Sequence, residues 1–488
     1  MGGSAPLSIA GLRGRYTPLM RYVSTRGDAQ PLDFEGVLLE GLARDGGLYV
    51  PESWPRWTPE DFRSLRGLSY AEIARRVMRP FLGDGVDDDA LGRIVCDAYC
   101  EFRHRAVAPL VQLGENRWLM ELFHGPTLAF KDVAMQVLAR LYDHALQKRG
   151  GRLTVVGATS GDTGSAAIEA FARSQRCDIF IMHPHQRTSE VQRRQMTTVE
   201  SPNVHNLAID GTFDDCQDLL KAMFTDAAFR DAVSLSGVNS INWARVLPQV
   251  VYYIAAGVAL GAPDREVAFC VPTGNFGDVY AGYVACRMGL PVSRFIVASN
   301  ANDILTRVLD TGDHTLGSVE PTMSPSMDIQ VSSNFERLLF DAHDRDGEAV
   351  RELMSKLKTD RGFTLDEAPL QRIRRNFCGY RVDETQTLDT IADTFHAAEM
   401  LVDPHTAVGL HAAEQARRAG EVDAATPLVT LATAHPAKFP GAVAEATGKL
   451  PPLPEHLADL YDREERYDRL PADLGEVQRY IQQRTHAT

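Results

Sequence analysis

The chain contains 488 residues, which is long enough for two or three domains around a substantial core. Hydrophobic residues make up 44% and charged residues 24% of the chain, which is typical of globular proteins and excludes a disordered or fibrous one. The formal net charge of -14 opposes nonspecific association with nucleic acid or anionic lipid. No stretch approaches the roughly 18 to 20 apolar residues that a membrane-spanning helix needs.

The seven cysteines are an odd number, and most lie in apolar runs such as "VAFCVP". This pattern predicts reduced thiols and hence a cytoplasmic protein. Cys96 and Cys100 are one helical turn apart and could begin a metal site, but no nearby pair of ligands completes the four that structural zinc needs. We therefore predict thiols rather than a metal.

Residues 1–19 contain basic residues and no acidic residue, and a second methionine follows at Met20. They lack the unbroken apolar centre of a secretory signal, although an acid-poor segment is compatible with organelle targeting. We expect a disordered N-terminal extension, consistent with a misassigned start, rather than a presequence.

The hydrophobic pattern changes near residue 107. Residues 20–106 place apolar residues three or four apart, which predicts a mainly helical N-terminal domain. Residues 107–450 alternate short β-branched runs with longer amphipathic ones, which predicts an α/β region with open, mostly parallel sheets and helices on both faces. Its clearest predicted strands are Leu153–Thr159, Glu266–Pro272 and Pro427–Thr433.

Two further segments are distinguished by their charge. Residues 312–384 are rich in charged runs and are predicted to form a mainly helical insertion with solvated faces. Residues 451–488 are predicted to form a polar C-terminal helix with a frayed tail.

Two glycine-rich loops, at residues 159–164 and 273–278, each follow a predicted strand and open a predicted helix. Unpaired backbone N–H groups and the positive end of the helix dipole make such a loop a candidate site for phosphate or carboxylate. Neither loop has the P-loop or the Gly-x-Gly-x-x-Gly pattern, so nucleotides have little support. The alternative is a tight turn that needs glycine for its shape alone.

Lys131, in "HGPTLAFKD", begins a predicted amphipathic helix beside Ala129 and Phe130. Desolvation favours the neutral amine, which can form a Schiff base with a carbonyl compound, and pyridoxal phosphate is such a compound with a phosphate handle. The alternative is a lysine that extends from a helix terminus into solvent.

The motifs "HGPTLAFKD", "ATSGDTG", "PTGNFGD" and "LATAHPAKFP", in this order, resemble the threonine synthase family, and specifically its long microbial and fungal branch. The pieces "MRYVSTRG", "NSINWAR" and "LVDPHTAVG" match that branch as well, so the resemblance extends from about Met20 to Leu450. It implies the tryptophan-synthase β-type fold, also called fold type II, of enzymes that depend on pyridoxal phosphate.

The resemblance implies a role for each motif in binding the cofactor. Lys131 would carry pyridoxal phosphate as a Schiff base. Thr433 would contact the pyridine nitrogen, and Asp162 would lie near the phenolic oxygen. The loop that would hold the cofactor phosphate consists of Gly274, Asn275, Phe276, Gly277 and Asp278.

The resemblance also implies the reaction. O-phospho-L-homoserine and water would become L-threonine and phosphate, by γ-elimination and β-addition of water, in the last step of threonine biosynthesis. Lys131 would act as the base at Cα. Ser160 and Thr163, with nearby backbone amides, would bind the substrate carboxylate.

A phosphate on the substrate needs its own cationic site. Arg245 is the first candidate and Lys438 the second, and the alternative for Arg245 is a structural ion pair. Arg187 is less persuasive because Ser189 and Gln192 have capping-box spacing. The motif histidines are expected to support neighbouring groups and are His124, His405 and His435.

Two other functions compete with this one. A threonine or serine dehydratase has the same fold but need not hold a phosphate on the side chain of its substrate. A non-catalytic relative would bind phosphorylated ligands without using Lys131. We expect a small-molecule substrate, a monomer or homodimer, and neither a nucleic-acid nor a membrane partner.

Overall fold

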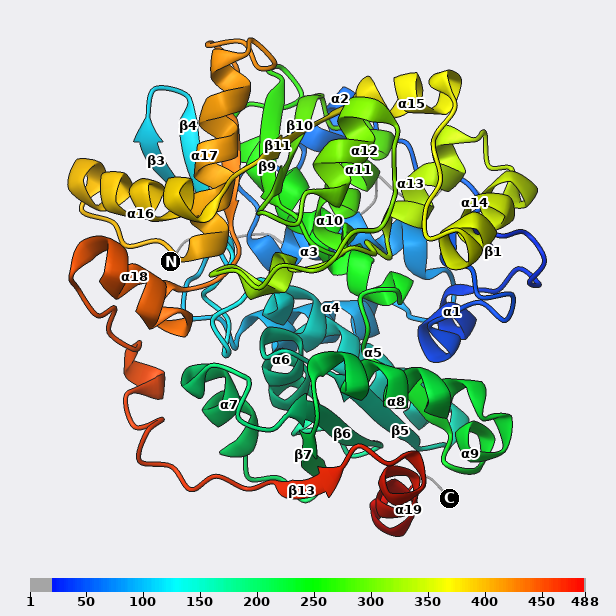
Figure 1. Cartoon of the computed structure of the whole chain (residues 1–488). Helices are drawn as coiled ribbons and strands as arrows, with labels where there is room; N and C mark the ends of the chain where they lie inside the picture. The colour runs from blue at the N-terminus through cyan, green and yellow to red at the C-terminus, as the bar shows by residue number, and fades with distance from the viewer. Residues whose placement is uncertain (1–19, 487–488) are drawn as a thin grey trace, which may run out of the picture.

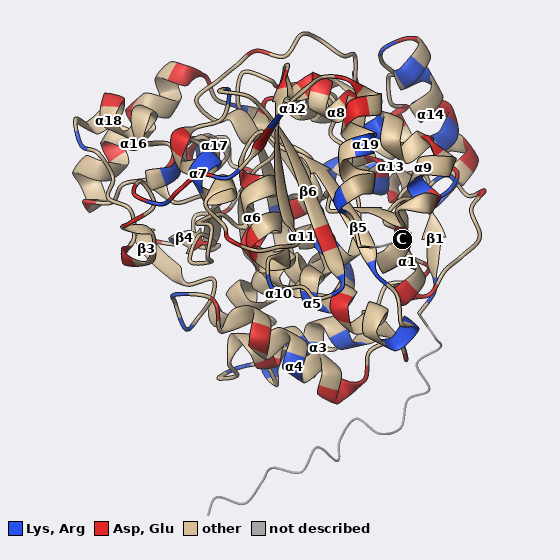
Figure 2. Ribbon diagram, turned by 90° about the horizontal axis from the view of Figure 1, so that it is seen from below, with Lys and Arg blue, Asp and Glu red and all other residues tan. Residues whose placement is uncertain are grey.

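The computed structural model of the chain describes residues 20–486 and contains one small and two large sheets (Figure 1). The predicted extension at residues 1–19 lies outside the described residues. Lys, Arg, Asp and Glu lie mainly on the peripheral helices and loops, with both signs interspersed (Figure 2). None of the helices between residues 20 and 486 combines the length and the apolar character that crossing a membrane requires.

The N-terminal part contains four helices and an antiparallel pair of short strands. Helix α3 has a capping box formed by Ser69 and Glu72, which satisfies N–H groups at its start. Apolar residues from this part join the same core cluster as residues of α5 and α10. Its elements are β1 (Tyr22–Ser24), α1 (Phe34–Glu40), β2 (Tyr49–Pro51), α2 (Pro59–Arg63), α3 (Tyr70–Leu82) and α4 (Asp88–Tyr99).

The first large sheet has six strands in the order β11-β10-β9-β12-β4-β3, and only β3 runs antiparallel to its neighbour. Its strands are β3 (Leu110–Gly114), β4 (Arg117–Glu121), β9 (Val267–Pro272), β10 (Val292–Ser299), β11 (Phe377–Arg381) and β12 (Leu428–Ala432). Its helical segments are α10 (Trp243–Ala259), α11 (Gly277–Met288), α12 (Ile304–Thr311), η1 (Pro325–Met327), α13 (Phe335–Ala342), α14 (Gly347–Thr359), α15 (Glu367–Arg374), α16 (Glu384–Ala398), α17 (Pro404–Arg418), η2 (Pro436–Lys438) and α18 (Pro440–Thr447).

The second large sheet has five parallel strands in the order β13-β7-β6-β5-β8. Its strands are β5 (Leu153–Ala158), β6 (Cys177–Pro184), β7 (Val204–Asp210), β8 (Leu235–Gly237) and β13 (Asp468–Pro471). Its helical segments are α5 (Lys131–Arg149), α6 (Asp162–Phe171), α7 (Glu190–Thr197), α8 (Phe213–Thr225), α9 (Ala227–Ala232), η3 (Glu455–Leu457) and α19 (Leu474–Arg484).

Helices cover both faces of each large sheet. In β9, Phe269 belongs to the core cluster that contains residues of α10 and α11, whereas Cys270 belongs to the cluster that contains residues of α17. Successive residues of β6, such as Phe180 and Ile181, likewise enter different clusters. Strands buried on both faces are apolar throughout, which explains runs such as "VAFCVP". The predicted mostly parallel sheets with helices on both faces are confirmed.

Residues 313–334, which we call the strap, connect α12 to α13 with a single short 3-10 turn. In Figure 1 the strap runs as a yellow-green segment between the two large sheets. Asp328 fixes it by accepting hydrogen bonds from the side chains of Asn300 and Asn302, at 2.8 and 3.1 Å. After the strap come α13 to α15 and strand β11, which adds an edge to the six-stranded sheet.

The C-terminal tail contains a strand as well as the predicted polar helix. Strand β13 pairs in parallel with β7. Its side chains are mostly exposed, so its sequence lacks the alternation of apolar and polar residues that predicts a strand. Helix α19 places Val477 and Ile481 in the core cluster that also contains residues of α8. The tail therefore packs onto the five-stranded sheet and its helices.

We predict that Ile481→Ala lowers the free energy of unfolding by about 2–5 kcal/mol, because the deletion leaves a cavity in a fully buried position. Gln483→Ala, at an exposed position on the same helix, serves as the control and changes stability by less than about 0.5 kcal/mol. Urea unfolding measures both, and equal effects of the two variants would contradict docking of the tail.

Candidate active site

Lys131 is the first residue of α5, and the backbone just before it is tied to the segment after β12. Phe130 N donates to Thr433 O at 2.9 Å, and His435 N donates to Leu128 O at 3.0 Å. Ala129 and Ala434 form an isolated antiparallel bridge. Thr433 is therefore brought next to the lysine from about 300 residues further along the chain.

The side chain of Lys131 is only 12% exposed, and its Nζ lies 3.1 Å from Asp162 Oδ2 and 5.2 Å from the centre of the Phe130 ring. Burial lowers the pKa of Lys131; Asp162 opposes this effect, and the positive charges of Lys438 and Arg245 reinforce it. The predicted desolvated amine is therefore present, and the alternative of a lysine extended into solvent does not fit.

Asp162 is the first residue of α6, and both of its carboxylate oxygens are used. Oδ1 accepts from Gln192 Nε2 at 2.8 Å and lies 3.0 Å from Lys438 Nζ. Oδ2 contacts Lys131 and accepts from Ser326 Oγ at 3.3 Å. Although burial raises it, the pKa of Asp162 is held well below its usual value by the two lysines. Asp162 is therefore a buried carboxylate.

The first glycine-rich loop turns tightly from β5 into α6. Thr159 Oγ1 accepts from the N–H groups of Gly161 and Gly164, both at 2.9 Å. Gly161 has φ 149°, and a Cβ there would lie 2.4 Å from Gln192, so both the backbone and the space require glycine. Ser160 is exposed and Thr163 half-buried at this turn.

The second glycine-rich loop leads from β9 to α11, whose start no side chain caps. Phe276 has φ 61°, and its buried ring packs edge-on against Phe335. Asn275 is exposed, and its carbonyl accepts from Asn334 Nδ2 at 3.0 Å. The uncapped N–H groups at the start of α11 can receive a phosphate.

The strap packs directly on this loop, because a Cβ on Gly274 would lie 2.6 Å from Ser326 O. Ser326 thus contacts both Gly274 and Asp162, and it places the second glycine-rich loop beside the Lys131 cluster. Its own N–H donates to His405 Nε2 at 3.2 Å, and His405 Nδ1 lies 2.6 Å from Asp403 Oδ2. No sequence motif indicated Ser326, because it lies in an irregular segment.

Asp278 is predicted to contribute to the phosphate loop, but its side chain faces α10. Oδ1 accepts from the hydroxyl groups of Tyr252 and Tyr253, the latter at 2.8 Å, and Oδ2 has no hydrogen-bond partner among residues 20–486. Burial raises the pKa of Asp278 to about 6. The carboxyl group therefore contacts α10, and the contribution of Asp278 to an anion site is limited to its backbone N–H.

Arg245 lies in the first turn of α10 and is 3% exposed. Its Nη1 donates to Val238 O at 2.6 Å, while the buried Nε has no partner within residues 20–486. No carboxylate of the described chain pairs with it, so the alternative of a structural ion pair is not observed. Burial lowers the pKa of Arg245 to about 10. A buried guanidinium without an anion fits a phosphate ligand.

Lys438, the second candidate for the substrate phosphate, is fully buried with all three donors used. Its Nζ donates to Thr127 O at 2.6 Å and to Gln195 Oε1 at 2.9 Å, and it pairs with Asp162 Oδ1. An ammonium group has only three donors. The prediction that Lys438 binds substrate phosphate therefore does not fit this geometry.

The motif histidines all have local partners. His124 Nε2 lies 2.7 Å from Glu121 Oε2, and His435 Nδ1 accepts from Ala437 N at 3.1 Å. His405 Nε2 accepts from Ser326 N, so each of the three histidines contacts a neighbouring group of the described chain. Among residues 20–486, no group of three or more His, Cys, Asp and Glu side chains is arranged to hold a metal ion.

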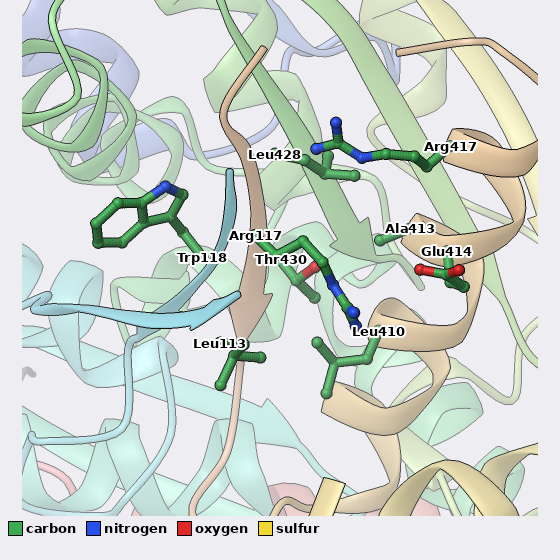
Figure 3. Close-up of a pocket in the computed structure, with 9 residues that line it drawn as sticks. All are labelled: Leu113, Arg117, Trp118, Leu410, Ala413, Glu414, Arg417, Leu428 and Thr430. Carbon is green, nitrogen blue, oxygen red and sulfur yellow. The ribbon is translucent and has the colours of Figure 1, made fainter. Parts of the chain in front are cut away.

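A small pocket lies between β4, β12 and α17, and none of its lining residues belongs to the two glycine-rich loops (Figure 3). It is lined by Leu113, Trp118, Leu410 and the stems of Arg117 and Arg417, and its volume of about 10 Å³ admits about one water molecule. It is therefore too small for a cofactor.

Comparison with known proteins identifies the family. Three family models match the chain: "Threonine synthase N terminus" over residues 21–99, "Pyridoxal-phosphate dependent enzyme" over residues 104–356, and "Threonine synthase, C-terminal" over residues 406–481. The threonine synthase of Pseudomonas aeruginosa is 55% identical over 465 residues, which cover 95% of this chain and 98% of that protein.

Solved structures agree with these matches. The threonine synthase of Brucella melitensis with bound pyridoxal phosphate is 55% identical and aligns with a TM-score of 0.93 over 96% of this chain and 100% of its own. The yeast threonine synthase is 37% identical and aligns with a TM-score of 0.90 over 96% and 99%. The predicted tryptophan-synthase β-type fold is confirmed, and the chain belongs to the threonine synthase family of pyridoxal-phosphate-dependent enzymes.

Proposed function

We propose that the chain converts O-phospho-L-homoserine and water to L-threonine and phosphate, with pyridoxal phosphate bound at Lys131. The observation that carries this proposal is the environment of one amine. Lys131 is buried beside Asp162, and the strap residue Ser326 joins that cluster to the uncapped start of α11. An amine for the cofactor aldehyde and a cradle for its phosphate thus occupy one region.

Each cofactor contact has a candidate on the chain. The backbone of residues 274–277 and the start of α11 would hold the cofactor phosphate. Thr433, held beside Lys131 by the Phe130 hydrogen bond, would face the pyridine nitrogen, and Asp162 would lie near the phenolic oxygen. When bound, pyridoxal phosphate withdraws electrons from the substrate carbons and so makes their protons removable.

Lys131 would also move protons during the reaction. With substrate and cofactor bound, its Nζ would accept the proton from Cα and later return it. The net elimination removes a proton from Cβ and phosphate from Cγ. The net addition of water then places its hydroxyl on Cβ and a proton on Cγ, and the Cα proton is returned to Cα. Asp162 keeps Nζ in position through their 3.1 Å contact.

Two anionic groups of the substrate need separate sites. The start of α6, with Ser160 and Thr163, would bind the carboxylate, while Arg245 would bind the phosphate. The unpaired Nε of Arg245 favours threonine synthase over a dehydratase, whose substrates carry no side-chain phosphate.

We also propose a cytoplasmic location and action as a monomer or homodimer on this small-molecule substrate. The seven cysteines are all free, and three of them are buried, which suits a reducing compartment.

We predict that Lys131→Ala lowers the rate of phosphate release from O-phosphohomoserine by at least 10²–10⁴-fold, roughly the range for loss of a general base. Lys358→Ala, at an exposed position, is the control and leaves the rate unchanged. Phosphate release is measured with threonine identified among the products. Full activity of Lys131→Ala, or release of phosphate without threonine, would contradict the proposed function.

We predict that Arg245→Met raises KM for O-phosphohomoserine by about 10–100-fold, which corresponds to the loss of a hydrogen bond to a charged group. Affinity for pyridoxal phosphate, measured by absorbance titration, stays near that of the unaltered protein. Thermal stability does not fall, because a buried unpaired charge is removed. If the affinity for pyridoxal phosphate falls by as large a factor as KM rises, Arg245 binds the cofactor phosphate and not the substrate phosphate, which would contradict this assignment.

A further inference from the structure

Asp162 is shared between two buried lysines. Its Oδ2 lies 3.1 Å from Lys131 Nζ, and its Oδ1 lies 3.0 Å from Lys438 Nζ. Lys131 comes from the start of α5, Asp162 from the start of α6, and Lys438 from η2 after β12. One carboxylate therefore faces two amines, only one of which the proposed chemistry uses.

The two lysines are held very differently. Lys438 is fully buried, and its ammonium group has three acceptors: Thr127 O, Gln195 Oε1 and Asp162 Oδ1. This set is complete for a charged lysine. Lys131 Nζ has a single hydrogen-bond partner, Asp162, within residues 20–486. Asp162 thus contacts one lysine whose three donors are all paired and one lysine whose amine has no other hydrogen-bond partner in the described chain.

Other charged groups act on this cluster. Arg245 of α10 acts on Lys131 with the same sign as Lys438, and Lys131 in turn acts on Asp278 of α11. His405 of α17 interacts electrostatically with Asp162. Lys438 interacts in the same way with Asp132, which is next to Lys131 on α5. Lys438 is the only cation apart from Lys131 within salt-bridge distance of Asp162 in the described chain. It is therefore placed to balance that carboxylate.

We propose that Lys438 is a positioning residue whose buried ammonium group balances Asp162, so that Asp162 orients the Lys131 amine without holding it as a cation. This proposal rests on the proposed function, in which that amine attaches the cofactor. It also gives Lys438 a role that its three occupied donors allow.

The sign of the effect follows from Coulomb's law. With Lys438 neutralised, Asp162 and Lys131 form a one-to-one buried ion pair, which favours the charged amine. Removing the positive charge of Lys438 at this range raises the pKa of Lys131. At a pH below that pKa, each unit of the rise lowers the neutral fraction of the Lys131 amine about tenfold.

The test measures attachment of pyridoxal phosphate to the cofactor-free full-length chain over a range of pH. The adduct is reduced with borohydride at timed points, and mass spectrometry identifies and quantifies the modified lysine. Lys438→Met is compared with Lys438→Arg, which keeps the charge, and with Lys358→Met at an exposed position. Titration of free pyridoxal phosphate is common to all the proteins and cancels in the comparison.

We expect the midpoint of the rate of attachment at Lys131 to move up by about one pH unit in Lys438→Met, with about tenfold slower attachment below it. Lys438→Arg and Lys358→Met keep the original midpoint. Should Lys438→Met fail to fold by circular dichroism, Lys438→Gln, which keeps a donor but no charge, is expected to show the same upward movement.

Three results would overturn the proposal. An unchanged or lowered midpoint in the neutral variant contradicts charge balance, and an equal movement in Lys438→Arg assigns the effect to packing. Attachment at a lysine other than Lys131 in the unaltered chain overturns the proposed function and this inference with it, whereas attachment at Lys131 with an unchanged midpoint overturns this inference alone.

Discussion

The carboxylate of Asp162 is the interaction on which the rest of the site depends. It begins α6, which follows β5 of the five-stranded sheet, yet it contacts Lys438, which follows β12 of the six-stranded sheet, and Ser326 of the strap. Burying such a group is costly unless every lone pair is used, and here two lysines, Gln192 and Ser326 provide partners. Asp162 therefore links the segment after β12 of the six-stranded sheet to the starts of α5 and α6, and Lys131 lies at this link.

The parallel sheets explain why segments so far apart in the chain come together. The first loop follows β5, the second follows β9, and Thr433 follows β12, each at the carboxyl end of its strand. Ligands of open α/β sheets bind outside those ends. Each of the two glycine-rich loops also opens a helix, so backbone N–H groups at the helix start can bind an anion in addition to the basic side chains nearby. A chain with net charge -14 can thus bind a dianion locally.

The sequence alone predicts a strand or a site residue where the physical signal is local. Strand β9 and the loop after it are announced by an apolar run followed by glycines, and Lys131 by its apolar neighbours. Strand β13 was missed because exposed edge residues carry no alternation. Ser326 was missed because its role comes from contacts with Gly274 and Asp162, which are about 50 and 160 residues away. For the same reason a motif could nominate Lys438 but could not reveal that its three donors are occupied.

A crystal structure of the full chain with pyridoxal phosphate and inorganic phosphate tests the central claim most directly, namely that Lys131 and the loop of residues 274–277 hold one molecule. We predict continuous density from Lys131 Nζ to the cofactor ring, with the cofactor phosphate at the start of α11 and a separate phosphate at Arg245. A cofactor phosphate bound elsewhere, or a ring without a bond to Lys131, would contradict the account.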